Sequence, residues 1–249
     1  MITKITLSLR CPQQPNGNEW AYMLYAALLR ETSTEFAANI HESTAAPISQ
    51  YVVPAQGRLC WQVGLLGEAC ERELLPVLLN KESYCLGKAA TELTVEKAEL
   101  ERIFMPQELV PTDLCGQAHE LELCTPAAFK QQGRFVNRPE PRLIVQNLVR
   151  RWNGCLPEWS IGWDDAQITE VADALRLRGL RVQDQPYGIK GNAIPGFVGT
   201  MQLENTLDDP RREILDELLA FAVFSGLGVK TALGMGGIRH RCVLPANKQ

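Results

Sequence analysis

The sequence predicts an α+β fold built from two tandem ferredoxin-like, or RRM-like, domains. Three observations support this prediction. Segments with strand-like alternation and segments with helical periodicity follow one another along all 249 residues. The same strand–helix–strand theme occurs twice, in halves of about 120 residues each. A dense run of glycines from residue 226 to residue 237 then follows the last helix as a C-terminal glycine-rich loop.

The first half begins with a strand and contains most of the predicted strand residues. Alternating apolar residues predict a strand over Thr3–Arg10, and an apolar stripe at helical spacing predicts a helix over Gly17–Arg30. Ser33 and Thr34 can cap a second, short helix that ends near His41. The other predicted elements are strands at Ile48–Pro54 and Leu59–Leu65, a helix at Glu68–Leu79, and strand-like sequence at Ser83–Leu93 and Leu100–Phe104.

The second half repeats the theme, and its last helix has the clearest start. Asp209 followed by Pro210 predicts that start, because a carboxylate caps the first turn and proline suits the first helical position. We place the domain boundary between residues 115 and 116, which gives domains 1–115 and 116–249. The other predicted elements are a helix at Pro139–Trp152 and strands at Glu120–Cys124, Leu175–Val182, Phe197–Leu203 and Arg239–Leu244.

Length and composition indicate a soluble globular protein. The residues are 45% hydrophobic and 22% charged. No apolar run reaches the roughly 18 residues that a membrane span requires. The first ten residues alternate like a strand and lack the apolar region of a signal peptide. We therefore expect a cytoplasmic protein without a membrane partner.

Cysteine and histidine spacing argues against a metal centre. Eight cysteines are present, but no Cys-x-x-Cys pair occurs among them. The three histidines, His41, His119 and His240, are far apart in the sequence. We predict no metal ligand set and no cofactor, and we expect reduced, mostly buried cysteines. His119 lies near the domain boundary and fits a structural or exposed position, whereas His240 fits a strand.

The charge is distributed unevenly along the chain. The net charge is −4, yet residues 1–129 hold 9 Lys and Arg against 16 Asp and Glu, a balance of −7. Residues 130–249 hold 16 against 13, a balance of +3. Basic character concentrated in one half is compatible with a phosphate-binding face there, and equally with a solvated surface.

The glycine-rich run encloses a Lys-Thr pair and ends beside an arginine, which suggests contact with a polyanion. Known phosphate-binding loops do not match it. Val229 separates Gly228 from Lys230, which breaks the Walker A spacing, and Thr231 stands where a dinucleotide-binding loop needs its third glycine. The run therefore suggests phosphate contact without nucleotide hydrolysis, with a glycine-rich hairpin lacking any ligand as the alternative.

These features resemble those of the CRISPR-associated endoribonucleases that cut repeat RNA, the sixth CRISPR-associated protein family. The segment Phe224–Gly237 is similar to the C-terminal glycine-rich loop of that family. Ile40-His41-Glu42, followed by Pro47-Ile48-Ser49, is similar to its histidine segment after the first helices. Further similar segments are Leu123–Pro126, Arg142–Asn153 and Pro195–Gly199, so the resemblance spans nearly the whole chain.

The resemblance implies metal-independent cleavage of CRISPR repeat RNA in precursor transcripts. The 2′-hydroxyl upstream of the cut attacks the adjacent phosphate and leaves a 2′,3′-cyclic phosphate and a 5′-hydroxyl. Such chemistry needs proton transfer at two oxygens and stabilisation of an anionic phosphorane. His41 is the predicted general acid or base, since histidine titrates near neutral pH. Some members of the family that this chain resembles have a lysine shortly after the histidine, but residues 42–57 contain neither lysine nor arginine. Tyr25 is therefore the predicted second proton carrier, with Tyr22 as the alternative.

The predicted RNA-binding residues all lie in or beside the glycine-rich run. Lys230 and Arg239 are predicted to clamp phosphate, although Arg239 also suits the start of the last strand, opposite an acidic residue. Two other functions stay open: a non-catalytic RNA-binding subunit with the same fold, and a nucleotide-binding α+β enzyme. A homodimer and a place among other CRISPR effector subunits also stay open. The predicted RNA-binding residues are Gly226, Gly228, Lys230, Thr231, Gly234, Gly236 and Arg239.

Overall fold

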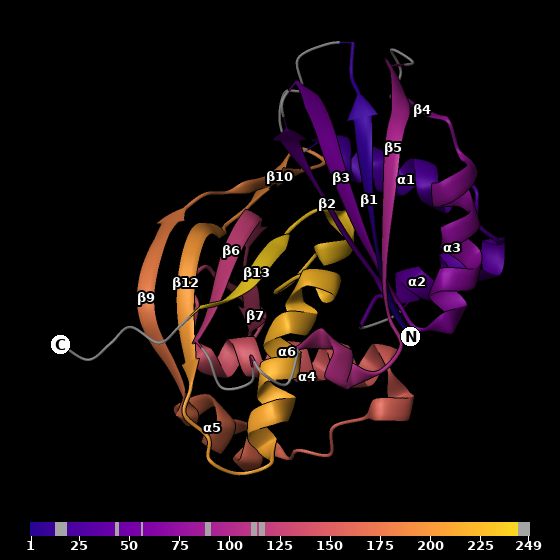
Figure 1. The fold of residues 1–249 in the computed structure, drawn as a ribbon. Coiled ribbons are helices and arrows are strands. Elements are labelled where there is room, and N and C mark those ends of the chain that lie inside the picture. The colour runs from indigo at the N-terminus through magenta and orange to yellow at the C-terminus, as the bar shows by residue number, and fades with distance from the viewer. Residues whose placement is uncertain are drawn as a thin grey trace.

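A computed structural model describes residues 1–12, 19–42, 45–55, 57–87, 91–110, 114 and 118–243, apart from the side chains of residues 19, 41 and 42. Two antiparallel sheets carry the fold (Figure 1). One sheet is formed by strands before residue 104, in the order β2-β3-β1-β5-β4. The other is formed by strands after residue 117, in the order β13-β6-β12-β9. The predicted boundary between residues 115 and 116 lies outside the described residues, and the division into two domains stays a prediction.

The first sheet confirms the strand pattern of the first half. Strand β1 occupies the centre, and its side chains alternate between buried and half-buried positions from Lys4 to Leu9. Helices α1 and α3 cover one face of this sheet (Figure 1). The elements are β1 (Ile2–Arg10), α1 (Glu19–Leu29), α2 (Thr34–Glu42), β2 (Ile48–Ala55), β3 (Arg58–Leu66), α3 (Glu68–Asn80), β4 (Ser83–Leu86), β5 (Thr91–Ile103) and the 3₁₀ helix η1 (Pro106–Leu109).

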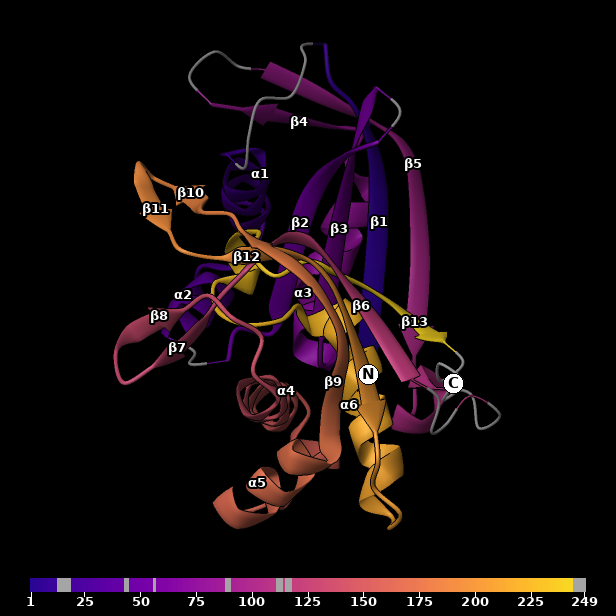
Figure 2. The ribbon, with the colours of Figure 1, turned by 90° about the vertical axis from the view of Figure 1, so that its left-hand side faces the viewer.

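The second sheet follows the predicted order with additional short elements. Two hairpins, β7–β8 and β10–β11, project toward the side of the molecule where α1 and α2 lie (Figure 2). The elements are β6 (Ala118–Ala127), β7 (Phe129–Gln131), β8 (Arg134–Val136), α4 (Pro141–Cys155), η3 (Pro157–Trp159), α5 (Asp165–Ala174), β9 (Leu175–Asp184), β10 (Tyr187–Ile189), β11 (Asn192–Ile194), β12 (Phe197–Asn205), α6 (Arg211–Ser225), η4 (Thr231–Leu233) and β13 (Ile238–Val243).

Helix α6 joins the two sheets. Its apolar residues share one buried cluster with Ile2 of β1, Leu66 of β3 and Ile103 of β5. At Gly64 of β3 the approach is so close that a Cβ atom would lie 1.9 Å from the carbonyl oxygen of Phe224. Only glycine fits there, because the backbone of α6 occupies the space of a side chain. The end of α6, where the glycine-rich run begins, is thereby fixed against the first sheet.

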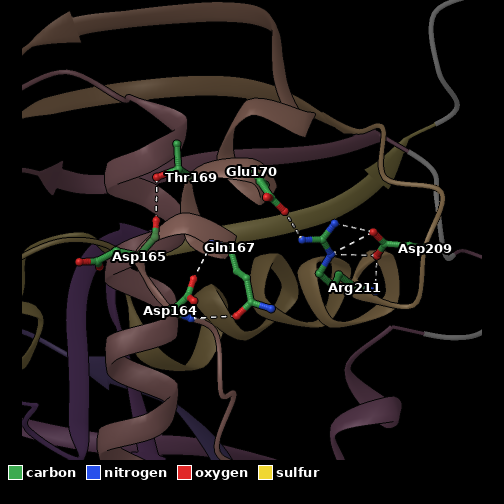
Figure 3. Close-up of polar contacts among 7 residues, drawn as sticks. All are labelled: Asp164, Asp165, Gln167, Thr169, Glu170, Asp209 and Arg211. Carbon is green, nitrogen blue, oxygen red and sulfur yellow. Dashed lines mark hydrogen bonds and ion pairs between the residues drawn. The ribbon is translucent and has the colours of Figure 1, made fainter.

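Helix α5 is absent from the sequence-based prediction, although its cap is encoded in the sequence. The carboxylate of Asp164 accepts the N–H of Gln167 at 2.8 Å, and the side chain of Gln167 accepts the N–H of Asp164 at 3.0 Å (Figure 3). This is a capping box, which satisfies two N–H groups at a helix start. Arg211 then binds both Asp209 and Glu170, which ties α5 to the start of α6 (Figure 3).

Among the described residues, no helix combines the length and the apolar composition that a membrane span requires.

Candidate functional site

A cavity of about 1020 Å³ lies where the two halves of the chain meet. Helices α1 and α2 contribute residues from the first half, and α4, the two short hairpins and the glycine-rich run contribute residues from the second half. Because α6 fixes the two sheets against each other, segments more than 200 residues apart line the same space. We call this space the basic cavity, for the charges described next.

Six cationic side chains line the basic cavity. The described lining residues include no aspartate or glutamate, although the chain as a whole carries a net charge of −4. Focusing of positive potential in a concave site favours an anionic ligand. The six residues are Arg30, Lys130, Arg150, Arg151, Lys190 and Lys230.

Two of these lysines occupy a backbone conformation that is rare for residues with a side chain. Lys190, in the turn between β10 and β11, has φ 50°, and Lys230, before η4, has φ 59°. Left-handed backbone is unfavourable for a non-glycine residue and tends to occur at functional sites. The ammonium of Lys190 also lies 4.9 Å from the ring centre of Tyr22, within the range of a cation–π contact.

The glycine-rich run is folded tightly against the protein itself. At Gly236 (φ +66°) a Cβ atom would lie 2.0 Å from the carbonyl oxygen of Leu227, and at Gly228 (φ +91°) it would lie 2.3 Å from that of Ala128. The N–H groups of the five glycines at 226, 228, 234, 236 and 237 all donate hydrogen bonds within the protein, to Ala222, Asn147, Thr231, Pro126 and Thr125 in that order.

This geometry changes the interpretation of the glycines. At Gly228 and Gly236 the close neighbour is a backbone carbonyl oxygen of the same chain. At the other three glycines it is a side chain, that of Thr231, Tyr187 or Tyr51, so the reason for glycine at all five positions is the packing of the loop. Gly228, Lys230 and Thr231 line the basic cavity, and their contact with RNA stays a prediction. The cationic group that this loop presents is Lys230, which is exposed, whereas the Thr231 side chain is buried. RNA contact by Gly226, Gly234 and Gly236 stays a prediction.

The two predicted catalytic residues come from neighbouring helices. Tyr25 lies on α1, is 5% exposed and lines the basic cavity, and burial raises its pKa to about 12. His41 lies in the last turn of α2, and its side chain is outside the described part of the structure. The preceding residue, Ile40, lines the basic cavity, and so does Ala37 one turn earlier. The backbone of His41 is therefore adjacent to the cavity wall.

Arg151 is a cavity residue that the sequence analysis did not single out. Its Nη2 donates to the carbonyl oxygen of Ser225 at 2.9 Å, and its buried Nε has no hydrogen-bond partner within the described residues. Burial lowers the pKa of its guanidinium. In the sequence, Arg150 and Arg151 contributed only to the positive charge of residues 130–249. Helical periodicity does not predict an arginine on the buried face of α4.

Arg239 lies outside the basic cavity. It is the second residue of β13, opposite Glu122, and its Nη1 forms an exposed ion pair with that carboxylate at 3.5 Å. It lines a second cavity of about 380 Å³ between α6 and the first sheet. Lys230 and Arg239, the predicted clamp, thus line different cavities. The ion pair with Glu122 and the separate cavity favour phosphate contact by Lys230 without Arg239, and the contact predicted from the sequence for Arg239 is left to experiment.

The two remaining histidines are in contact with each other. His119 is fully buried, which rules out an exposed position, and its Nε2 lies 2.9 Å from Oδ1 of Asp216. Its Nδ1 lies 2.9 Å from Nε2 of His240, which occupies β13 as predicted. Burial lowers the pKa of His240 to about 4, so its ring is neutral at physiological pH.

Of the seven described cysteines only Cys70 and Cys155 are buried, so the prediction of mostly buried cysteines is wrong.

The chain is similar in sequence to known proteins. A family model described as CRISPR-associated endoribonuclease Cas6 matches residues 121–238. The predicted resemblance is confirmed. A Cas6 endoribonuclease of Mycobacterium tuberculosis is 25% identical over 231 residues, covering 90% of this chain and 73% of that protein. A Cas6 endoribonuclease of Streptococcus thermophilus is 25% identical over 225 residues, covering 90% and 92%.

Solved structures of Cas6 proteins have the same fold. A Cas6 product complex has a TM-score of 0.78 at 22% identity and covers 97% of this chain and 99% of that one. Thermus thermophilus Cas6 has a TM-score of 0.71 at 22% identity and covers 97% and 98%. Together with the two antiparallel sheets, this likeness confirms the predicted α+β, ferredoxin-like fold class.

Proposed function

We propose that the protein is an endoribonuclease that cleaves CRISPR repeat RNA in precursor transcripts. The single observation that carries the proposal is the basic cavity: six cations and no described acid, in a chain similar to Cas6 over most of its length. RNA supplies the polyanion that such a cavity selects. The similar structures include a Cas6 product complex and a Cas6 substrate mimic complex, which adds support for an RNA ligand.

The proposed reaction proceeds without a catalytic metal. The upstream 2′-hydroxyl loses its proton and attacks the scissile phosphorus, and the departing 5′-oxygen takes up a proton. Tyr25 donates the proton to the departing 5′-oxygen, because its raised pKa keeps the phenol protonated. His41 is then the general base that takes the proton of the 2′-hydroxyl. One of the similar structures is that of a histidine-to-alanine mutant of a Cas6 protein, which supports a histidine as a proton carrier. Lys230 and the other cavity cations stabilise the phosphorane.

The alternative is a non-catalytic RNA-binding subunit of a CRISPR effector complex. The absence of Lys and Arg from residues 42–57 favours this alternative, because it removes a cation next to His41. The same basic cavity would then hold RNA without cutting it.

A single incubation distinguishes the two functions. End-labelled CRISPR repeat RNA is incubated with the protein in EDTA, and the product ends are identified. Our proposal expects a 2′,3′-cyclic phosphate and a 5′-hydroxyl, and no cut when the nucleotide upstream of the cleavage site is 2′-deoxy. Binding without cleavage supports the subunit instead. Cleavage that requires Mg²⁺ contradicts the mechanism.

A further inference from the structure

Three potential metal ligands converge on the side of the second sheet that faces α6. His119 belongs to β6, and His240 and Cys242 are two residues apart on β13, so both project to one face of the sheet. Cys242 is directly opposite His119 in the antiparallel register. The ligating atoms of the three residues all lie within 4.8 Å of one another.

A buried carboxylate fixes the orientation of this cluster. Asp216 of α6 is fully buried, and its Oδ1 accepts from Nε2 of His119 at 2.9 Å and from Nδ2 of Asn205 at 2.6 Å. Donation by Nε2 leaves the lone pair of His119 on Nδ1, which points at His240. A carboxylate behind a histidine is the usual support of a metal-ligating imidazole, because it sets the tautomer and raises the basicity of the ring.

We propose that His119 Nδ1, His240 Nε2 and Cys242 Sγ bind one Zn²⁺ ion, with a water at the fourth position. Imidazole and thiolate ligands suit zinc, which takes four ligands in tetrahedral geometry. Zn–N bonds of about 2.0–2.1 Å place two ligand nitrogens about 3.3 Å apart in a tetrahedron. Nδ1 of His119 and Nε2 of His240 are 2.9 Å apart, so the two rings need to move apart by only about 0.4 Å to bind the ion.

Charge and proton balance also fit this ion. The Cys242 thiolate and the Asp216 carboxylate together neutralise the two charges of Zn²⁺ inside a poorly solvated region. Binding releases the thiol proton of Cys242, and the proton on Nε2 of His240 moves to its Nδ1. His240 and Cys242 are half-buried, and His240 lines the 380 Å³ cavity, which gives the ion a route from solvent.

The role of the ion is structural. None of its three ligands lines the basic cavity, and they join β13, the last described strand, to β6, with Asp216 linking the site to α6. A ligand that binds only the folded state stabilises it by mass action. With free Zn²⁺ at about 100 times its dissociation constant, the melting temperature should rise by about 5–10 °C.

The test uses the intact chain without RNA, so its outcome is independent of the proposed cleavage. The protein is stripped with a chelator, reloaded with Zn²⁺, dialysed and analysed for metal by mass spectrometry. We expect one Zn²⁺ per chain, and close to none in Cys242→Ser. Cys85→Ser is the matched control, because Cys85 is exposed on β4 of the other sheet and should leave the metal content unchanged. Circular dichroism of each variant checks that it is folded.

Co²⁺ provides a readout of the ligands themselves. Loading with Co²⁺ should produce a thiolate-to-cobalt charge-transfer band in the wild type and in Cys85→Ser, but not in Cys242→Ser. His240→Ala should weaken Zn²⁺ binding by at least about tenfold, and Asp216→Asn by about 10–100-fold as the supporting residue. Less than one Zn²⁺ per ten folded wild-type chains, or a full complement in folded Cys242→Ser, overturns the proposal.

Discussion

Asn147 and Gly228 exchange two hydrogen bonds between α4 and the glycine-rich run. The Gly228 N–H donates to Oδ1 of Asn147 at 2.8 Å, and Nδ2 of Asn147 donates to the Gly228 carbonyl oxygen at 3.3 Å. Both residues are buried. This pair fixes the start of the loop that carries Lys230 into the basic cavity, and it uses an amide side chain because only an amide offers an acceptor and a donor side by side.

Replacing Asn147 with alanine should therefore destabilise the protein. The change leaves a buried N–H and a buried carbonyl of Gly228 without their partner, which costs about 1–3 kcal/mol. The free energy of unfolding from urea titration measures the loss. Gln146→Ala is the matched control, because Gln146 is the half-exposed neighbour on the same helix and should change that energy by less than about 0.5 kcal/mol. Equal losses in both variants would remove the role of the Asn147–Gly228 pair.

Gly236 supplies a second stability prediction. Alanine at this position places its Cβ 2.0 Å from the Leu227 carbonyl oxygen and holds an unfavourable φ of +66°. We expect Gly236→Ala to lower the free energy of unfolding by more than about 1 kcal/mol. Gly188→Ala, on β10, is the control, since a Cβ there meets no atom within 4 Å. Unchanged stability with weakened RNA binding would return Gly236 to a direct role at the RNA.

The sequence predicted best the elements whose apolar residues recur at the regular spacing of a strand or a helix. Strand β1 and helix α4 have clean apolar periodicity, and both form close to the predicted residues. Strand β5 was predicted only at its two ends, within Ser83–Leu93 and Leu100–Phe104, and residues 94–99 between them were not assigned. It forms one strand of 13 residues, since pairing with β1 satisfies its backbone while its side chains stay exposed. The periodicity of the local sequence gives no information on such pairing with a distant strand.

The candidate site was predicted less completely than the fold. Lys230 was chosen from the glycine-rich run and Tyr25 from the family resemblance, and the structure brings them to the same cavity. Arg151 and Lys190 were not chosen, because their approach to the cavity depends on how α4 and a short hairpin are oriented. The His119–His240 pair joins residues 121 positions apart. No spacing rule for metal ligands detects a cross-strand pair of that kind.

His41 is expected to contribute to the rate of cleavage and little to affinity. Removal of a general acid or base typically costs about 10²–10⁴ in rate, so single-turnover cleavage by His41→Ala should fall in that range. Its dissociation constant for uncleaved repeat RNA should stay within about threefold of the wild-type value. Asn39→Ala serves as the control, because Asn39 is exposed on the same helix. Cleavage by His41→Ala at the wild-type rate would exclude this histidine from the mechanism.

Tyr25 should act as a proton donor with an effect that does not change with pH. Burial raises its pKa to about 12, so the phenol is protonated at pH 6 and remains protonated at pH 9. Tyr25→Phe should therefore slow single-turnover cleavage by the same factor across that range. Tyr22→Phe keeps the ring that faces Lys190 and should cleave normally. A rate deficit of Tyr25→Phe that grows from pH 6 to pH 9 would instead indicate a phenolate base.

Lys230 is expected to contact a single phosphate, and the salt dependence of binding tests this. Each phosphate contact with single-stranded nucleic acid contributes about 0.7 to the slope of log K against log salt. Lys230→Ala should lower the slope by about that amount for varied RNA sequences, because a phosphate contact carries no sequence information. Arg239→Ala is the matched comparison. Its ion pair with Glu122 and its place in another cavity predict an unchanged slope. If the slope falls for Arg239→Ala and not for Lys230→Ala, RNA follows the second cavity and the basic cavity is not its binding site.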